Sequence, residues 1–334
     1  MVADQKMDGE VPHTALAGSQ RELVGAHLLL LNRLLRRSAR ADFAFFEPRN
    51  QMERRVVLLL DRIGEGRVSQ MADVLGNDIA QVSRALRALA DCALVERAGP
   101  REPYQLSATG AELGRTLEVI ALAREHELER GFDPHEMFEL GGILSRMQAS
   151  AGEELARELE SPAASHAPPP DRAGARATRL SSIDFPGLVH PTIASLATMI
   201  MRSANVAYKR DTGLSSHEWR VLANVAGRPG VAFSDLVELI QSDKAQVHRS
   251  LDSLVVSGVL SRDRSGHGQP VRYAMTEKGS AVHDVLLANA RERGRRILAD
   301  LNPRQRERLQ DYFDRLIANA VGMSQRADAG LLPQ

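Results

Sequence analysis

Two short stretches of this chain carry, at the same spacing, side chains of types that can form paired hydrogen bonds with nucleic-acid bases. The pattern Ala-Gln-Val-x-Arg occurs at Ala80–Arg84 and again at Ala245–Arg249. Glutamine can make two hydrogen bonds to adenine, and arginine can make two to guanine, in the major groove. The glutamine and arginine stand three positions apart, so on an α-helix they share one face. The pattern therefore indicates a helix face that contacts bases.

Apolar residues at helical spacing lie on the opposite side of both stretches. They are Val82, Leu86 and Leu89 in the first, and Val247, Leu251 and Leu254 in the second. The polar residues left for DNA contact are Asn77, Gln81, Ser83, Arg84 and Arg87, and then Ser242, Lys244, Gln246, His248 and Arg249. We expect Asn77 and Ser242 at helix N-termini, where backbone N–H groups attract a phosphate. A polar face is often only a solvated surface, but Gln and Arg recur in both stretches while the neighbouring surface residues change.

The two stretches belong to a longer internal repeat. Residues 52–97 align with 217–262 at an offset of 165 positions without a gap. After a four-residue insertion the offset is 169, which pairs Tyr104 with Tyr273 and Gly110 with Gly279. A repeat of this length is a duplicated domain rather than a solenoid unit.

The order of expected elements is the same in both copies. In the first copy we expect helices at 51–63, 70–75 and 77–92, then strands at 95–97 and 104–106, with Ser69 as the N-cap of the second helix. In the second copy we expect helices at 216–226, 234–240 and 243–257, then strands at 260–262 and 271–275. Long helices are expected at 16–44, 109–130, 190–210, 277–299 and 303–320, with another opening at Asp133-Pro134. Helix, turn, helix and hairpin form a winged helix-turn-helix, whose second helix enters the major groove. Arg101, Arg264 and Arg272 are the candidate contacts from the hairpins, called wings.

Composition limits the class of protein. The 334 residues suit two domains, and a 43% hydrophobic and 26% charged content is ordinary for a globular chain. The single Cys92, for which we expect a packing role, fits a reducing cytoplasm, and no apolar run is long enough to span a membrane. The formal net charge is zero, so basic residues must gather on the DNA face and acids such as Glu125, Glu127 and Glu129 on the long helices. The predicted organisation is a tail (1–12), a first unit (13–160), a Pro-rich linker (161–186), a second unit (187–323) and a tail (324–334).

Stretches of both copies resemble a known family. The stretch SQMADVLGNDIAQVSRALRALADCALVER at 69–97 is similar to the DNA-binding core of the MarR (multiple-antibiotic-resistance regulator) family, as are SSHEWRVLANVAGRPG at 215–230 and YAMTEKG at 273–279. The resemblance implies a bacterial transcription regulator, usually a repressor, often released from DNA by a small aromatic or phenolic ligand. It also implies that the long helices are dimerisation helices. The family's Asp-x-Arg of the wing is missing: Ala98 and Pro100, or His267 and Gln269, stand in its place.

The resemblance also implies a ligand site between the dimerisation helices and the DNA-binding lobe. Candidate lining residues are His190, Tyr208, His217 and Trp219, or alternatively the cluster of Phe43, Phe45 and Phe46. The competing interpretations are a core position for Trp219, helix capping by His217 and Glu218, and packing between the copies for the phenylalanines.

The sequence thus predicts a mainly α protein with small β wings, in which two winged-helix units form an intramolecular pseudo-dimer. Its expected function is ligand-responsive regulation through double-stranded DNA with two half-sites. Association of two chains into a homodimer stays open. No catalytic motif, metal-ligand spacing or cofactor motif is visible, so neither an enzyme nor a cofactor is expected. The alternative is a protein-interaction module, in which Arg84 and Arg249 pair with acids of a partner protein.

Overall fold

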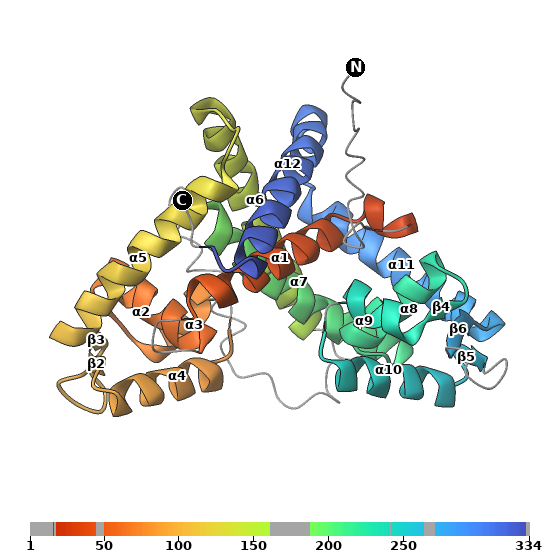
Figure 1. Ribbon diagram of the computed structural model, residues 1–334, viewed down its shortest axis with the longest axis horizontal. Helices are drawn as coiled ribbons and strands as arrows, with labels where there is room; N and C mark the ends of the chain where they lie inside the picture. The colour runs from red at the N-terminus through yellow and green to blue at the C-terminus, as the bar shows by residue number, and fades with distance from the viewer. Residues whose placement is uncertain are drawn as a thin grey trace, which may run out of the picture. The chain divides into compact units, whose positions relative to one another are not determined.

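The computed structural model describes residues 16, 18–44, 50–75, 77–160, 188–240, 242–263 and 271–331 (Figure 1). These residues form mostly helices and two small antiparallel sheets, which confirms the mainly α fold class with β wings. The chain divides into two compact units. The large unit holds residues 28–206 and 293–334, and the small unit holds residues 1–27 and 207–292. The domain boundaries expected from the sequence stay a prediction, and the expected linker lies outside the described residues.

The first winged helix belongs to the large unit. Its elements are α2 (Gln51–Ile63), β1 (Glu65–Gly66), α3 (Val68–Leu75), α4 (Ile79–Asp91), β2 (Val95–Glu96) and β3 (Tyr104–Leu106), with strand order β1-β3-β2. Asn50 caps α2 by accepting a hydrogen bond from the Met52 N–H, and Gly64, at φ 77°, ends that helix. Apolar residues of α2, α3 and α4 form one buried core.

The second winged helix belongs to the small unit and repeats this order. Its elements are α8 (Ser216–Gly227), β4 (Val231–Ala232), α9 (Phe233–Ile240), α10 (Lys244–Val256), β5 (Leu260–Asp263) and β6 (Arg272–Met275), with strand order β4-β6-β5. In both copies a two-residue strand, β1 or β4, adds a third strand that the sequence did not predict. Two residues are too few to show an alternating pattern.

The repeated glycine of each copy marks a close backbone approach. A side chain at Gly110 would overlap the carbonyl of Leu94, and one at Gly279 would overlap the carbonyl of Val259. In each copy this contact places the start of the long helix that follows the wing against the end of the helix-turn-helix. The same steric need accounts for a glycine at both positions.

Two of the expected helix caps were wrong. The helix α3 begins at Val68, so Ser69 is not its N-cap. The N-cap of α4 is Asp78 rather than Asn77, because Asp78 accepts the N–H of Gln81. In the second copy the N-cap of α10 is Asp243, where the expected helix begins, and it accepts the N–H of Gln246. Cys92 is exposed at the C-terminal end of α4, so it has no packing role.

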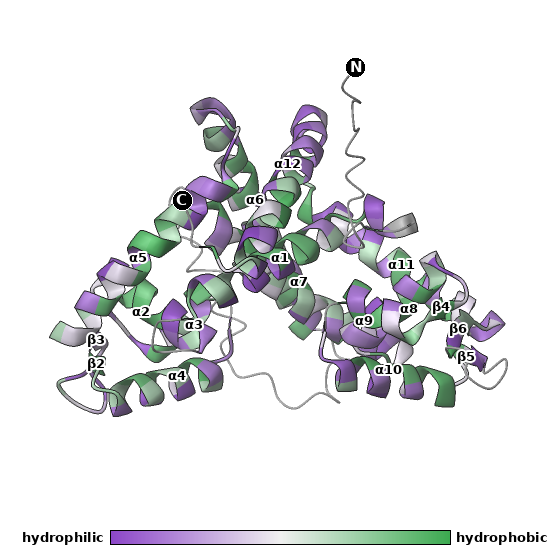
Figure 2. Cartoon of the chain, in the orientation of Figure 1, coloured by the Kyte–Doolittle hydropathy of each residue, from purple (hydrophilic) through white to green (hydrophobic). Residues whose placement is uncertain are grey.

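The remaining elements are long helices and one short 3₁₀ helix. They are η1 (Gly18–Glu22), α1 (Val24–Asp42), α5 (Ala108–Leu128), α6 (Pro134–Glu160), α7 (Val189–Thr212), α11 (Glu277–Ile297) and α12 (Pro303–Asp328). Hydrophobic and hydrophilic residues alternate along them, as in the winged helices (Figure 2). No described helix is both long and apolar enough to cross a membrane.

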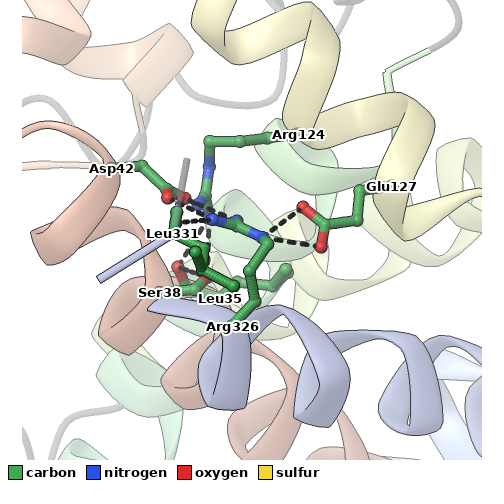
Figure 3. Close-up of polar contacts among 7 residues, drawn as sticks. All are labelled: Leu35, Ser38, Asp42, Arg124, Glu127, Arg326 and Leu331. Atoms are coloured by element: carbon green, nitrogen blue, oxygen red, sulfur yellow. Dashed lines mark hydrogen bonds and ion pairs between the residues drawn. The ribbon is translucent and has the colours of Figure 1, made fainter. Parts of the chain in front are cut away.

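A buried cluster of four charges joins α1, α5 and α12 in the large unit (Figure 3). The carboxylate of Asp42 accepts hydrogen bonds from both Arg124 and Arg326, the latter at 3.0 Å. Arg326 also donates to Glu127 at 2.8 Å. Arg124 donates further to the Leu35 carbonyl at 2.9 Å and to the Ser38 hydroxyl at 3.0 Å. Two cations therefore meet two anions, and the cluster is electrically balanced.

Removing one member should destabilise the large unit strongly. We expect Arg326→Leu to lower the free energy of unfolding by about 3–5 kcal/mol, because it leaves the buried Glu127 without its partner and Asp42 with only one of its two. The matched control is Arg37→Leu, which breaks an exposed ion pair between Arg37 of α1 and Asp328 of α12, 2.8 Å apart. It should cost less than about 1 kcal/mol. Urea denaturation of both variants is the measurement, and equal losses would contradict the role given to the buried cluster.

Candidate nucleic-acid interface and the pocket beside it

The outward face of α4 carries the predicted base-reading residues. Gln81, Arg84 and Arg87 are exposed, and Ser83 is half-buried. The opposite face is buried against α2 and α3, since Val82, Leu86 and Leu89 are at most 1% exposed. The predicted inward and outward sides of this helix are thus confirmed, whereas its contact with DNA stays a prediction.

The outward face of α10 is polar like that of α4, but its charged residues differ. Lys244, Gln246, His248 and Arg249 are all exposed. His248 lies 2.9 Å from Asp252, which replaces the Arg87 of the first copy and also lies 3.4 Å from Arg262. The second helix therefore offers fewer unpaired positive charges than the first.

The arginines of the wings differ in their surroundings. Arg101 is exposed in the turn between β2 and β3. Arg272 is exposed too, but its guanidinium donates to the Gly230 carbonyl at 2.7 Å and so braces the sheet. Arg264 lies outside the described residues.

A polar relay holds the start of α4 against α2. The guanidinium of Arg55 donates to Asn77 Oδ1 at 3.0 Å and to the Leu75 carbonyl at 2.9 Å. The amide of Asn77 then donates to Gln81 Oε1 at 2.9 Å. In the second copy Arg220, the counterpart of Arg55, donates to the hydroxyl of Ser242 at 3.0 Å. Asn77 and Ser242 therefore fix the turn of each helix-turn-helix, and their predicted phosphate contacts stay untested.

A pocket opens in the large unit on the inner side of α2. Its lining residues come from α1, α2, the end of α3, α5 and the start of α7, and they are Ala39, Phe43, Gln51, Arg54, Arg55, Leu58, Arg62, Leu75, Ala121, Arg124, Glu125, Leu188, His190, Pro191 and Ala194. We call it the Glu125 pocket. Elements of both repeats contribute, because α7 belongs to the second. The lining is largely apolar, with four arginines.

Two of the predicted ligand residues meet in this pocket and three lie elsewhere. Phe43 and His190, expected as alternatives, both belong to the lining. Tyr208 and Trp219 pack ring to ring in the small unit, with centroids 5.9 Å apart. Phe46 lies outside the described residues.

His217 joins two helices of the small unit. Its Nδ1 lies 2.8 Å from the Ser250 hydroxyl, which connects α8 to α10, and burial lowers its pKa to about 4. The capping expected here is provided by Glu218, which forms a capping box with Ser215 at the start of α8.

The charges in the Glu125 pocket are set by burial. Glu125 is 4% exposed, and its carboxylate accepts the backbone N–H groups of Val189 and His190 at the start of α7. Burial outweighs these donors and raises the pKa of Glu125 to about 8. Burial likewise lowers the pKa of His190 to about 3. At neutral pH both side chains are therefore uncharged. Arg124 is balanced by Asp42 and Arg62 lies 3.5 Å from Glu118, whereas Arg55 donates to neutral acceptors and leaves a positive charge at the pocket.

The buried charged residues in and beside the pocket were not predicted from the sequence. Glu125 and Glu127 were expected to be surface acids on a long helix, and they do lie on α5, but they are buried. Arg54 and Arg124 are also buried, at 7% and 1% exposed, although charged residues on amphipathic helices normally face solvent. The unbroken apolar pattern of α1, α2 and α5 gave no signal for them.

Comparison with known proteins finds that one part of the chain is similar to a family. Residues 212–269, which span α8 to the end of β5, match the MarR family. No curated protein matches the chain. Similar solved structures include a MarR/EmrR family transcriptional regulator from Acinetobacter sp. ADP1, with 22% identity over 37% of this chain and 88% of that chain and a TM-score of 0.34. A MarR family regulator from Silicibacter pomeroyi has 24% identity over 37% and 87%, with a TM-score of 0.33. A probable transcriptional regulator from Pseudomonas aeruginosa has 26% identity over 35% and 93%, with a TM-score of 0.30.

The raised pKa of Glu125 predicts a pH-dependent stability. The folded chain keeps this proton up to about pH 8, whereas an unfolded carboxyl releases it near 4.5. The folded state thus binds more protons across this window, so the free energy of unfolding falls as the pH rises through it. Glu125→Gln keeps an acceptor oxygen for α7 but cannot ionise. It should be more stable than the wild type by at least ~1 kcal/mol at pH 8.5, with the difference shrinking towards pH 5.

Urea denaturation at pH 5, 7 and 8.5 measures this effect. Glu112→Gln, at an exposed position of the same helix, is the control and should follow the wild-type profile. Parallel profiles for Glu125→Gln and the wild type would show that Glu125 is ionised in the folded protein.

Proposed function

We propose that this chain is a sequence-specific DNA-binding transcription regulator, acting as a tandem of two MarR-like winged helices in which α4 and α10 each read one half of an operator. The observation that carries the proposal is the repeated Gln and Arg pair, exposed on both helices above a buried apolar face. The MarR family domain at 212–269 supports the same assignment for the second copy.

Duplication within one chain favours a pseudo-dimer. Two DNA-binding helices on one chain engage their half-sites as a linked pair, at an effective local concentration of order millimolar. DNA affinity then does not depend on the association of separate chains. We further propose that the regulator is a repressor and that the Glu125 pocket holds the small ligand that releases it.

The features of the wings favour a second candidate, a protein-interaction module. The family's Asp-x-Arg is missing from both wings, and Arg97 and Arg272 donate to backbone carbonyls at 2.9 and 2.7 Å. Of the wing arginines in the described residues, Arg101 is left to reach a groove. The interaction-module candidate predicts that acidic residues of a protein partner, rather than DNA, contact Arg84 and Arg249.

Single arginine substitutions distinguish the two functions. We expect Arg84→Ala and Arg249→Ala each to weaken binding to DNA from the chain's own upstream region by about 10- to 100-fold, the loss of one bidentate base contact. The measurement is a gel-shift titration at fixed salt. Arg304→Ala removes an equal charge from the exposed start of α12 and should change affinity less than about threefold. Equal effects of all three substitutions, or no specific shift by the wild type, would favour the interaction module.

The unequal helices predict an operator with two dissimilar half-sites. The first copy presents Arg87 where the second has Asp252, which pairs with His248 and Arg262. Selection of binding sequences from random DNA, followed by footprinting, should give two different motifs about one helical turn apart. A perfect palindrome, or protection of one half only, would contradict this expectation.

A further inference from the structure

We propose that each chain has one effector site rather than two: the Glu125 pocket takes an organic anion with an apolar body, whereas the equivalent place in the second repeat is filled by aromatic side chains. The proposal rests on the regulatory function proposed above and specifies how that regulation is built. A pair of identical subunits would carry two equal sites, so the asymmetry is a property of this duplicated chain.

The repeat alignment identifies the residues that differ. At the offset of 165, Phe43 corresponds to Tyr208 and Arg54 to Trp219; at the offset of 169, Gly114 corresponds to His283. The second repeat therefore has three rings where the first has one ring, one arginine and a glycine. In addition, Arg62 of the pocket lining corresponds to Gly227, so the second repeat also lacks two of the cations.

The three rings of the second repeat form a packed cluster within the small unit. Trp219 lies edge-on to Tyr208 with centroids 5.9 Å apart, and 5.2 Å from the His283 ring. Tyr208 is only 3% exposed. In the first repeat, by contrast, the guanidinium carbon of Arg54 lies over the Phe43 ring, 5.1 Å from its centroid, and both residues border the open pocket.

The lining of the Glu125 pocket indicates the chemistry of its ligand. Phe43, Leu58 and Ala121 offer apolar surface, which suits an aromatic or aliphatic body. The guanidinium of Arg55, whose hydrogen-bond acceptors are neutral, favours an acceptor with negative charge in this pocket. Glu125, held neutral by its raised pKa, does not oppose that charge.

Arg55 connects this pocket to the first reading helix. It belongs to the lining and also donates to Asn77, whose amide in turn holds Gln81. A ligand that contacts Arg55 differently in the free and DNA-bound states will shift this relay and with it the side chain proposed to read a base. We therefore infer that the ligand acts first on α4, and that α10 responds only through the rest of the protein.

Titration calorimetry of the full chain with 2-naphthoate tests the site. We expect one molecule bound per chain, with at least tenfold weaker binding of the neutral 2-naphthamide. Arg54→Trp, which gives the first repeat the residue of the second, should abolish binding. Ala121→Phe is a second way to fill the pocket, and it leaves the buried Arg54 in place. Trp219→Ala, outside the pocket, is the control and should bind naphthoate with unchanged affinity. Circular dichroism and thermal melting check that each variant is folded.

Several results would overturn the proposal. They are two equal sites per wild-type chain, undiminished binding by a folded Arg54→Trp or Ala121→Phe variant, lost binding by folded Trp219→Ala, or no binding of naphthoate by the wild type. Hydrogen exchange gives a second readout: naphthoate should change the exchange of amides 77–84 and leave 242–249 unchanged, and the reverse pattern would contradict the relay. Failure of the DNA gel shift with one naphthoate still bound per chain would count against the proposed function and leave the site intact.

Discussion

The structure of the large unit depends on one carboxylate shared between two guanidiniums. Asp42 lies at the end of α1 and is 1% exposed, so its charge would be very costly without partners. Arg124 of α5 and Arg326 of α12 both donate to it, and Glu127 balances the second arginine. Because α5 follows the wing strand β3 with a single residue between them, this cluster also ties the first winged helix to the long helices. Arg124 lines the Glu125 pocket as well, so pocket and hydrogen-bonded cluster share a residue.

The use of charge inside the protein explains why the net charge of the chain says little about its partners. Lysine and arginine together equal aspartate and glutamate, at 43 each. Some of these charges pair with one another between helices, such as the buried Glu154 with the partly exposed Arg296 at 2.7 Å. The arginines of α4 and α10 are left on the surface. Local distribution rather than the total therefore decides which face attracts an anion.

Local patterns predicted the elements well, and tertiary contacts account for what they missed. The apolar spacing of Val82, Leu86 and Leu89 gave the orientation of α4, because a helix buries one stripe. The N-cap was misplaced by one residue because Asn77 is held by Arg55, which stands 22 residues earlier in the chain. A contact between residues so far apart in the chain cannot be predicted from a local sequence pattern.

For the same reason, the sequence indicated only some of the residues that line the Glu125 pocket. Phe43 and His190 drew attention as an aromatic residue and a histidine, but they looked like members of separate sites. They meet because the start of α7 packs against α5, where Glu125 accepts its backbone N–H groups. Neither the buried glutamate nor the arginines around it break the helical pattern of their own segments.

The capping of α7 by Glu125 limits how the chain can be divided into two fragments, one for each repeat. The helix that opens the second repeat has its first turn inside the unit built on the first. Dividing the gene between the repeats would give one fragment a buried acid without its donors and the other a helix with bare N–H groups. Complementation of the two copies in trans would therefore have to restore this junction first.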